Sequence, residues 1–308
     1  MKKSIIMAAA ALSLSFGMQA QTEAPADSAV FDHGVVYVEP LFEYPSAPEN
    51  IETFRDKCNW LVENFWKPLN VNPKETVDQA KLSDAVKVYI TACQYADKAK
   101  TVASVEKLYK SIQKNPSLLF QMTKAAEETI FGPRAEVWID ELYVEILRNA
   151  LSQKKFPAQR RARYEAQLKQ LENSLLGGKP ASFGFVRPDG SPATYFPMST
   201  PTLIFFGSPD CDDCRMAKLR LQSNVAFNKA INEGKINVLY IIPDADEGWE
   251  KKVSDYPSKW AVGASDTVSE VMDIRDIPDI YVIDGEGKIV SKHSSLTESM
   301  QTILSLVQ

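Results

Sequence analysis

Two cysteines stand two residues apart in the segment GSPDCDDCRMAKLRL, at Cys211 and Cys214. A thiolate attacks a disulfide sulfur, and a second thiol one helical turn away can release the mixed disulfide that forms. The same spacing also occurs in metal sites and in permanent structural disulfides. The elements that position the two cysteines must therefore decide between these three interpretations.

A continuous apolar run, TPTLIFF at 200–206, precedes the cysteines and predicts a buried central strand. A short turn follows, and Cys211 then opens a helix that runs on through Leu219, Val225 and Ile231. Free N–H groups and the helix dipole favour a thiolate at such an N-terminus. This arrangement of strand, turn and helix favours an exchangeable dithiol, in which Cys211 attacks and Cys214 resolves.

A metal site is the weaker interpretation of the pair. A zinc ion needs about four ligands, which usually come from two such cysteine pairs or from added histidines. The chain has two histidines, His33 and His293, and neither stands at ligand spacing from the cysteines. We therefore expect no metal, and a permanently oxidised structural pair is the remaining alternative to a dithiol.

Three carboxylates surround the first cysteine, from Asp210, Asp212 and Asp213. Like charges disfavour an ionised thiol, so these residues are expected to keep the pKa of Cys211 higher than in a strongly oxidising protein. A less stabilised thiolate makes the reduced form less favoured, which shifts the couple toward a reductant. Arg215 and Lys218 are expected to offset part of this effect.

The pattern around the cysteines predicts an α/β sheet with helices on its faces. A strand, a Pro-Asp-Gly turn and a second strand are predicted within 181–196, and KINVLYII at 235–242 is a second buried strand. A hairpin is expected over 279–293. Helices are expected over 247–257, 265–272 and 296–307. The predicted α/β domain covers 179–308, with the domain boundary at 177–180, where Gly177 and Gly178 end a helix.

The preceding part of the chain predicts a leader and an all-helical domain. Residues 1–20 combine two lysines, an apolar run and small residues, which is typical of a secretory signal peptide cleaved after Ala20. Residues 21–45 are interpreted as an N-terminal arm. Apolar residues then recur at helical spacing over 46–176, which predicts about six helices. Cys58 and Cys93 lie on two of these apolar stripes, either as buried free thiols or as a disulfide.

Charge and hydropathy exclude two classes of partner. Without the two leader lysines, 33 basic residues face 40 acidic ones. This balance argues against nucleic acid, which binds basic surfaces. Beyond the leader, no stretch is apolar enough to span a membrane. An exported protein of the cell envelope or periplasm is therefore expected.

The segments TLIFF, SPDCDDC and IRDIPDIYVIDGEGKIV together resemble a thioredoxin-fold domain. The chain is similar to exported thioredoxin-like proteins of Bacteroidota, of the TlpA branch, that carry an N-terminal helical domain of unknown function. The resemblance implies that Pro278 is a cis-proline facing the disulfide and that Ile277 offers backbone groups to an extended substrate. It also shows departures, because Asp210 replaces a tryptophan, Phe205 replaces a buried acid and Asp279 replaces a common threonine.

The expected function is that of an exported thiol–disulfide oxidoreductase, which reduces or isomerises protein disulfides. Its substrates would be disulfide-bearing envelope proteins, and the chemistry needs no bound cofactor. By resemblance, a membrane thiol reductase would donate the electrons. The alternative is a protein- or glycan-binding module, in which the helical domain acts and the thioredoxin-like domain is a scaffold.

Overall fold

The computed structural model describes residues 39–72, 76–132, 135 and 137–307. The expected signal peptide at 1–20 lies outside the described residues, and so does most of the expected N-terminal arm. The described chain divides into two compact units, a helical unit that ends at Tyr164 and an α/β unit that begins at Glu165.

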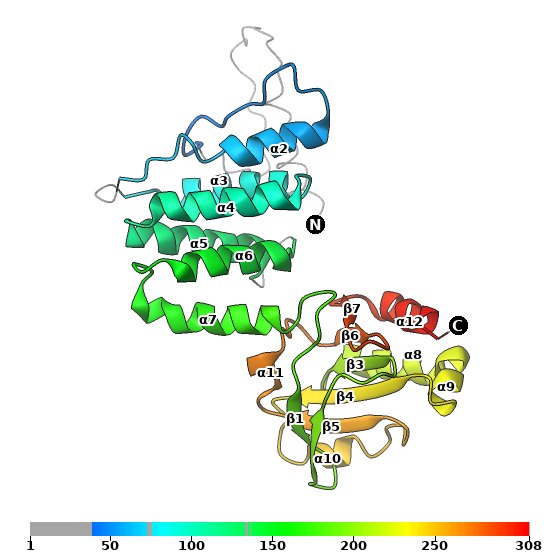
Figure 1. Ribbon diagram of the computed structural model, residues 1–308. Coiled ribbons are helices and arrows are strands. Elements are labelled where there is room, and N and C mark those ends of the chain that lie inside the picture. Colours follow the sequence, from blue (N-terminus) through cyan, green and yellow to red (C-terminus); the bar gives the residue numbers. More distant parts are fainter. Residues whose placement is uncertain (1–38, 73–75, 133–134, 136, 308) are drawn as a thin grey trace, which may run out of the picture. The chain divides into compact units, whose positions relative to one another are not determined.

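The helical unit is a stack of amphipathic helices (Figure 1). Polar side chains at Thr53, Asp78 and Asn115 accept hydrogen bonds from backbone N–H groups and fix three of the helix starts. Its first five helices are α2 (Phe54–Asn64), α3 (Gln79–Cys93), α4 (Lys98–Ile112), α5 (Pro116–Ile130) and α6 (Asp140–Ser152). In chain order, the second of these helices (α3) packs against the first (α2) and the fourth (α5), and the third (α4) packs against the fifth (α6).

Glu127 provides a buried polar anchor for the last helix, α7 (Ala158–Glu172). Its carboxylate accepts a hydrogen bond from the Tyr164 hydroxyl at 3.0 Å and forms a salt bridge with Arg163. Arg161 donates to the carbonyl oxygens of Leu151 and Gln153 at 2.7 and 3.0 Å, near the end of α6. The arginines at the start of α7 therefore stabilise helix ends and a buried carboxylate.

The α/β unit is built on one seven-stranded sheet, in the order β2-β1-β5-β4-β3-β6-β7. The three inner strands β3, β4 and β5 are parallel, whereas β1, β6 and β7 pair antiparallel with their neighbours. The strands are β1 (Phe183–Val186), β2 (Pro192–Tyr195), β3 (Thr202–Phe206), β4 (Asn237–Pro243), β5 (Ala261–Ser265), β6 (Asp279–Ile283) and β7 (Ile289–Lys292).

Each face of the sheet carries its own apolar core. On one face, Phe205 and Tyr240 pack with Cys214 and with residues of α8 (Asp212–Ser223), α9 (Val225–Asn232) and α12 (Leu296–Ser305). On the other face, Phe206 and Tyr281 pack with β1, β2 and α11 (Val268–Val271). Strand β3 is buried along its whole length, as its unbroken apolar sequence predicts.

Three predicted elements differ from the structure. The helix predicted after Cys211 is two helices, because Asn224 ends α8 and caps α9. The helix predicted over 247–257 is the single turn α10 (Trp249–Lys252). The helix predicted over 265–272 was largely wrong, since β5 precedes it and only α11 is helical. The β5 sequence AVGAS has mostly small side chains, which do not indicate a strand. The strand forms because it pairs with β4.

The division between the units falls inside α7, whereas the sequence placed the domain boundary at 177–180. Beyond Glu165, side chains of this region bond to the α/β unit: Gln170 donates to the Ser269 carbonyl and Asn173 to the Val271 carbonyl, at 2.5 and 3.0 Å. A single continuous helix therefore contributes to both units. None of the helices within the described ranges is long and apolar enough to cross a membrane.

Candidate active site

Cys211 and Cys214 are joined by a disulfide at the start of α8, with their Cα atoms 5.2 Å apart. Cys211 is the N-cap of the helix, and its sulfur accepts a hydrogen bond from the Cys214 N–H at 3.1 Å. Cys211 is partly exposed, whereas only 1% of Cys214 is. Cys211 is therefore the sulfur that an incoming thiol or disulfide can reach.

The turn before Cys211 is held by the central strands. The Gly207 N–H donates to the Ile241 carbonyl at 3.0 Å, which extends the pairing of β3 with β4 by one residue. The Cys211 N–H then donates to the Ser208 carbonyl at 3.2 Å. Gly207 is packed closely, because a Cβ there would lie 2.6 Å from the Tyr240 hydroxyl oxygen. The strand and its turn thus fix where the disulfide stands.

The predicted substrate-binding residues lie beside the disulfide. The carbonyl oxygen of Ile277 is 3.9 Å from Sγ of Cys211, although 66 residues separate them in the chain. The peptide bond between Ile277 and Pro278 is cis, the isomer that the resemblance implied. The structure therefore brings Cys211, Cys214, Ile277 and Pro278 together, and the Cys211 sulfur faces backbone from the Ile277–Pro278 segment.

The three predicted carboxylates differ in their surroundings. Lys252 donates to Asp210 at 2.6 Å, and this hydrogen bond raises the pKa of Lys252. Arg215 donates to Asp212 at 2.5 Å, and Asp213 is exposed. Cations beside the first two carboxylates reduce the negative field that they exert on the thiol. Arg215, one of the two cations expected to offset the carboxylates, thus pairs with Asp212.

Lys218 has a different partner from the one that the sequence suggested. Its buried ammonium donates to Asp255 at 2.7 Å and lies 4.2 Å from the centre of the Tyr256 ring. The bond from Lys218 lowers the pKa of Asp255. In the same apolar cluster as Cys214, Phe205 stacks on Tyr240 with ring centres 4.8 Å apart. Phe205, which stands where the resemblance to thioredoxins would place a buried acid, is therefore part of a stacked aromatic pair.

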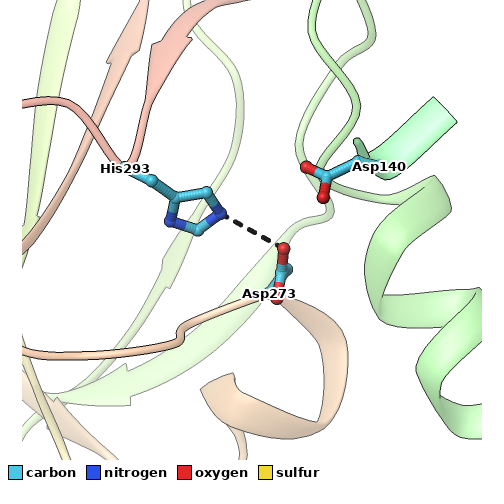
Figure 2. Close-up of side chains that lie close together, drawn as sticks. All are labelled: Asp140, Asp273 and His293. Carbon is cyan, nitrogen blue, oxygen red and sulfur yellow. Dashed lines mark hydrogen bonds and ion pairs between the residues drawn. The ribbon is translucent and has the colours of Figure 1, made fainter. Parts of the chain in front are cut away.

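A buried ionic network beside the Ile277–Pro278 segment was not predicted from the sequence. Figure 2 shows His293 bonded to Asp273, and the distance from Nε2 to that carboxylate is 3.2 Å. The other ring nitrogen, Nδ1, lies 2.9 Å from Asp279. Arg275 donates to Asp273 at 2.8 Å, and Lys292 lies 3.5 Å from the same carboxylate. Charged residues next to the buried strand β6 were the signal in the sequence that could have indicated it.

The network shifts the pKa values of its members. Burial would raise the pKa of Asp273, but hydrogen bonds from His293 and Arg275 outweigh it and hold the pKa well below its usual range. Burial by itself would lower the pKa of His293, but the hydrogen bonds to Asp273 and Asp279 outweigh burial and raise the pKa above its usual value. The cations of Arg275 and Lys292 already balance Asp273, so we assign no metal to it. Asp140, also labelled in Figure 2, begins α6 of the helical unit.

Three comparisons place the chain among known proteins. Among solved structures, a thioredoxin-like protein from Bacteroides caccae aligns with a TM-score of 0.69 and 19% identity, covering 88% of this chain and 100% of that one. The thioredoxin domain of a thiol-disulfide oxidoreductase from Bacteroides vulgatus aligns at 22% identity and a TM-score of 0.38, covering 44% of this chain and 99% of that one. A search of curated proteins finds no match.

The first of these alignments supports a thioredoxin-like fold, with an all-helical part before it. Solved structures similar to the chain include proteins named as thiol-disulfide oxidoreductases. A family model described as a domain of unknown function, DUF5106, matches residues 16–174, which is just over half of the chain. The chain therefore belongs to the DUF5106 family, and a thioredoxin-like fold follows the family's domain.

Proposed function

We propose that this protein is an exported thiol–disulfide oxidoreductase that reduces or isomerises disulfides of envelope proteins. The observation that carries the proposal is the asymmetric disulfide, with Cys211 accessible at a helix N-terminus and Cys214 buried behind it. A purely structural disulfide has no need of one exposed sulfur. The nearby Ile277 carbonyl supports the proposal, because it offers backbone to a substrate beside the reactive sulfur.

The proposed reaction begins from the reduced protein. The Cys211 thiolate attacks one sulfur of a substrate disulfide, the other substrate sulfur leaves as a thiolate, and a mixed disulfide forms. Cys214 loses its proton and attacks Cys211, which releases the second substrate thiol and leaves the Cys211–Cys214 disulfide. Two electrons have then passed to the substrate. A dithiol donor, proposed to be a membrane thiol reductase, returns the protein to its reduced form.

The local electrostatics favour attack by Cys211 rather than by Cys214. The N-terminal N–H groups of α8 stabilise a thiolate at Cys211, and the Cys214 N–H already donates to that sulfur. Burial in the core disfavours a thiolate at Cys214. We therefore propose that Cys214 loses its proton only when the mixed disulfide has formed next to it.

Trapping of the mixed disulfide tests this proposal. In Cys214→Ser the first attack remains possible but release does not, so disulfide-linked adducts with envelope proteins should accumulate. Cys211→Ser is the matched control, because it differs by the same single atom and should trap nothing. Absence of adducts with Cys214→Ser, in cells and with insulin as an added substrate, would contradict the proposed function.

A redox titration in thiol buffers provides a second test. The Cys211–Cys214 pair, measured by alkylation and mass spectrometry, should be a reversible two-electron couple near the thioredoxin range of about −270 mV. A pair that stays oxidised well below about −300 mV would instead be a structural bridge. A Cys211→Ser/Cys214→Ser double variant that kept its cellular role would then favour a binding role for the helical domain.

A further inference from the structure

The Ile277–Pro278 segment is attached at both ends to one buried cluster. Asp279, which follows Pro278, is 3% exposed and begins β6, opposite Phe206 at the end of β3. Asp273, four residues before Ile277, is 4% exposed. The segment between these two carboxylates is the one that contacts Cys211, so the positions of Asp273 and Asp279 determine where its backbone lies.

His293 joins these two carboxylates. Its Nδ1 lies 3.0 and 2.9 Å from the two carboxylate oxygens of Asp279, and its Nε2 lies 3.2 Å from Oδ2 of Asp273. The residue has a φ of 52°, in the left-handed region that a non-glycine residue adopts at a cost. The ring packs against Tyr281, with ring centres 5.4 Å apart, and thus bridges the start and the end of the segment.

The protonation state of this bridge follows from its geometry. An ionised carboxylate only accepts hydrogen bonds, and an imidazole donates from both nitrogens only when it is protonated. Both ring nitrogens of His293 face carboxylates, so the imidazolium satisfies both contacts, whereas the neutral ring turns a lone pair toward one carboxylate. The bridge is therefore complete only in the protonated form.

Other charged and titratable groups of the α/β unit also face the cluster. Arg275 donates to both oxygens of Asp273, at 3.2 and 3.1 Å from Nε, and Lys292 of β7 lies 3.5 Å from it. The Tyr281 hydroxyl donates to the Asp273 carbonyl. Asp273 thus stays in place through its cations when His293 is neutral. Asp279 has the Arg275 N–H at 3.4 Å and depends more strongly on His293.

We propose that His293 is a positioning residue for the oxidoreductase reaction, which holds the Ile277–Pro278 segment against Cys211 through Asp279 and Asp273 for the binding of extended protein disulfides. This inference rests on the proposed function and adds a determinant of substrate affinity to it. A small disulfide needs only the Cys211 sulfur, whereas a polypeptide disulfide also uses the backbone of the segment. His293 therefore affects protein substrates and spares small ones.

Two disulfide probes and a range of pH separate this effect from titration of the thiols. The full mature chain is reduced and reacted in single turnovers with insulin and with 5,5′-dithiobis(2-nitrobenzoic acid), from about pH 6 to about pH 9. Ionisation of Cys211 changes the maximal rate with both probes alike. Loss of the His293 proton should instead raise the half-saturating insulin concentration alone, by about three- to tenfold, the range that one lost hydrogen bond spans.

The variant His293→Gln should give the high-pH insulin affinity of the wild type at every pH, with its rate toward the small disulfide unchanged within about twofold. Ser265→Ala is the matched control, because it removes a buried hydrogen bond of the same unit, 2.7 Å from the Gly184 carbonyl, that does not involve the segment. It should keep the wild-type pH dependence. Any general effect of lost stability would appear in both variants.

A half-saturating insulin concentration of the wild type that is constant across this pH range would overturn the inference. The wild-type measurement decides this by itself, even where His293→Gln does not fold. A His293→Gln variant that keeps the wild-type pH dependence would overturn it too. Failure of the proposed function differs from both results, because the reduced wild type would then leave insulin unreduced at every pH, although its partly exposed Cys211 thiol would still react with the small disulfide.

Discussion

Gly207 joins β3 to the turn that carries Cys211, and its replacement by alanine tests how closely this junction is packed. A Cβ at this position would lie 2.6 Å from both Cε1 of Phe205 and the Tyr240 hydroxyl oxygen. Ordinary contact begins near 3.4 Å, so atoms must shift by most of an ångström. Both rings are fully buried and stacked on each other, and neither can move without displacing its neighbours.

We expect Gly207→Ala to lower the free energy of unfolding of the α/β unit by about 1–3 kcal/mol, the usual cost of an extra methyl group in a packed core. Gly184→Ala is the matched control, because its Cβ would meet only the Ala193 carbonyl, at 3.9 Å. It lies on the exposed side of β1, and alanine there should be neutral or stabilising by about 0.5 kcal/mol.

The assay is urea denaturation of the full chain, with hydrogen exchange measured on peptides from β3, β4 and β6. These peptides report on the α/β unit separately from the helical unit, which a global signal would not do. Equal stabilities of Gly207→Ala and Gly184→Ala would refute the reasoning, since it predicts a loss of stability for the first change and none for the second. The close packing of the turn would then have no energetic consequence.

Three further predictions concern buried groups. Glu127→Gln keeps an acceptor for Tyr164 but loses the charge facing half-exposed Arg163, so it should cost the helical unit about 1 kcal/mol, whereas Glu127→Ala should cost about 2–3 kcal/mol in thermal unfolding; equal costs would contradict this assignment. Because the pKa of Asp273 is lowered, the ionised carboxylate stabilises the fold above its ordinary pKa of about 4, and this is lost as the pH falls. The stability advantage of the wild type over Asp273→Asn should therefore shrink from about pH 6 to about pH 2, and a constant difference would count against it. Desolvation raises the pKa of the Cys93 thiol to about 12 and also raises that of Cys58, so neither should react with iodoacetamide in the native oxidised protein at neutral pH, and both should react after denaturation without reductant; rapid alkylation of the native chain would show that the thiols are reactive in the folded state.

Much of the fold follows from local patterns in the sequence. Apolar residues at helical spacing predicted an all-helical part over 46–176, where α2 to α7 lie, and the unbroken apolar runs predicted β3 and β4. The dithiol was predicted because a strand, a turn and a helix start can be recognised within some 15 consecutive residues. For Cys58 and Cys93 of the helical unit, the sequence left open either free thiols or a disulfide, and in the structure both are free.

The features that the sequence did not predict arise from pairing between distant segments. Strand β5 forms because β4 offers it a parallel edge, and its small residues carry no signal of their own. The cluster of Asp273, Asp279 and His293 forms because the antiparallel pairing of β6 with β7 folds residue 293 back onto residue 279. Each residue taken alone is an ordinary polar residue near a turn, and only the register brings the three together.

The hydrogen bond from the Cys214 N–H to the Cys211 sulfur links the redox state to the integrity of a helix end. As a thiolate, this sulfur would be a charged cap, and as part of a mixed disulfide it becomes a neutral, displaced one. The first turn of α8 should consequently tighten on reduction and loosen while a substrate is attached. The Cys214 amide is thus expected to report on turnover, because its chemical shift should differ between the reduced, oxidised and mixed-disulfide states.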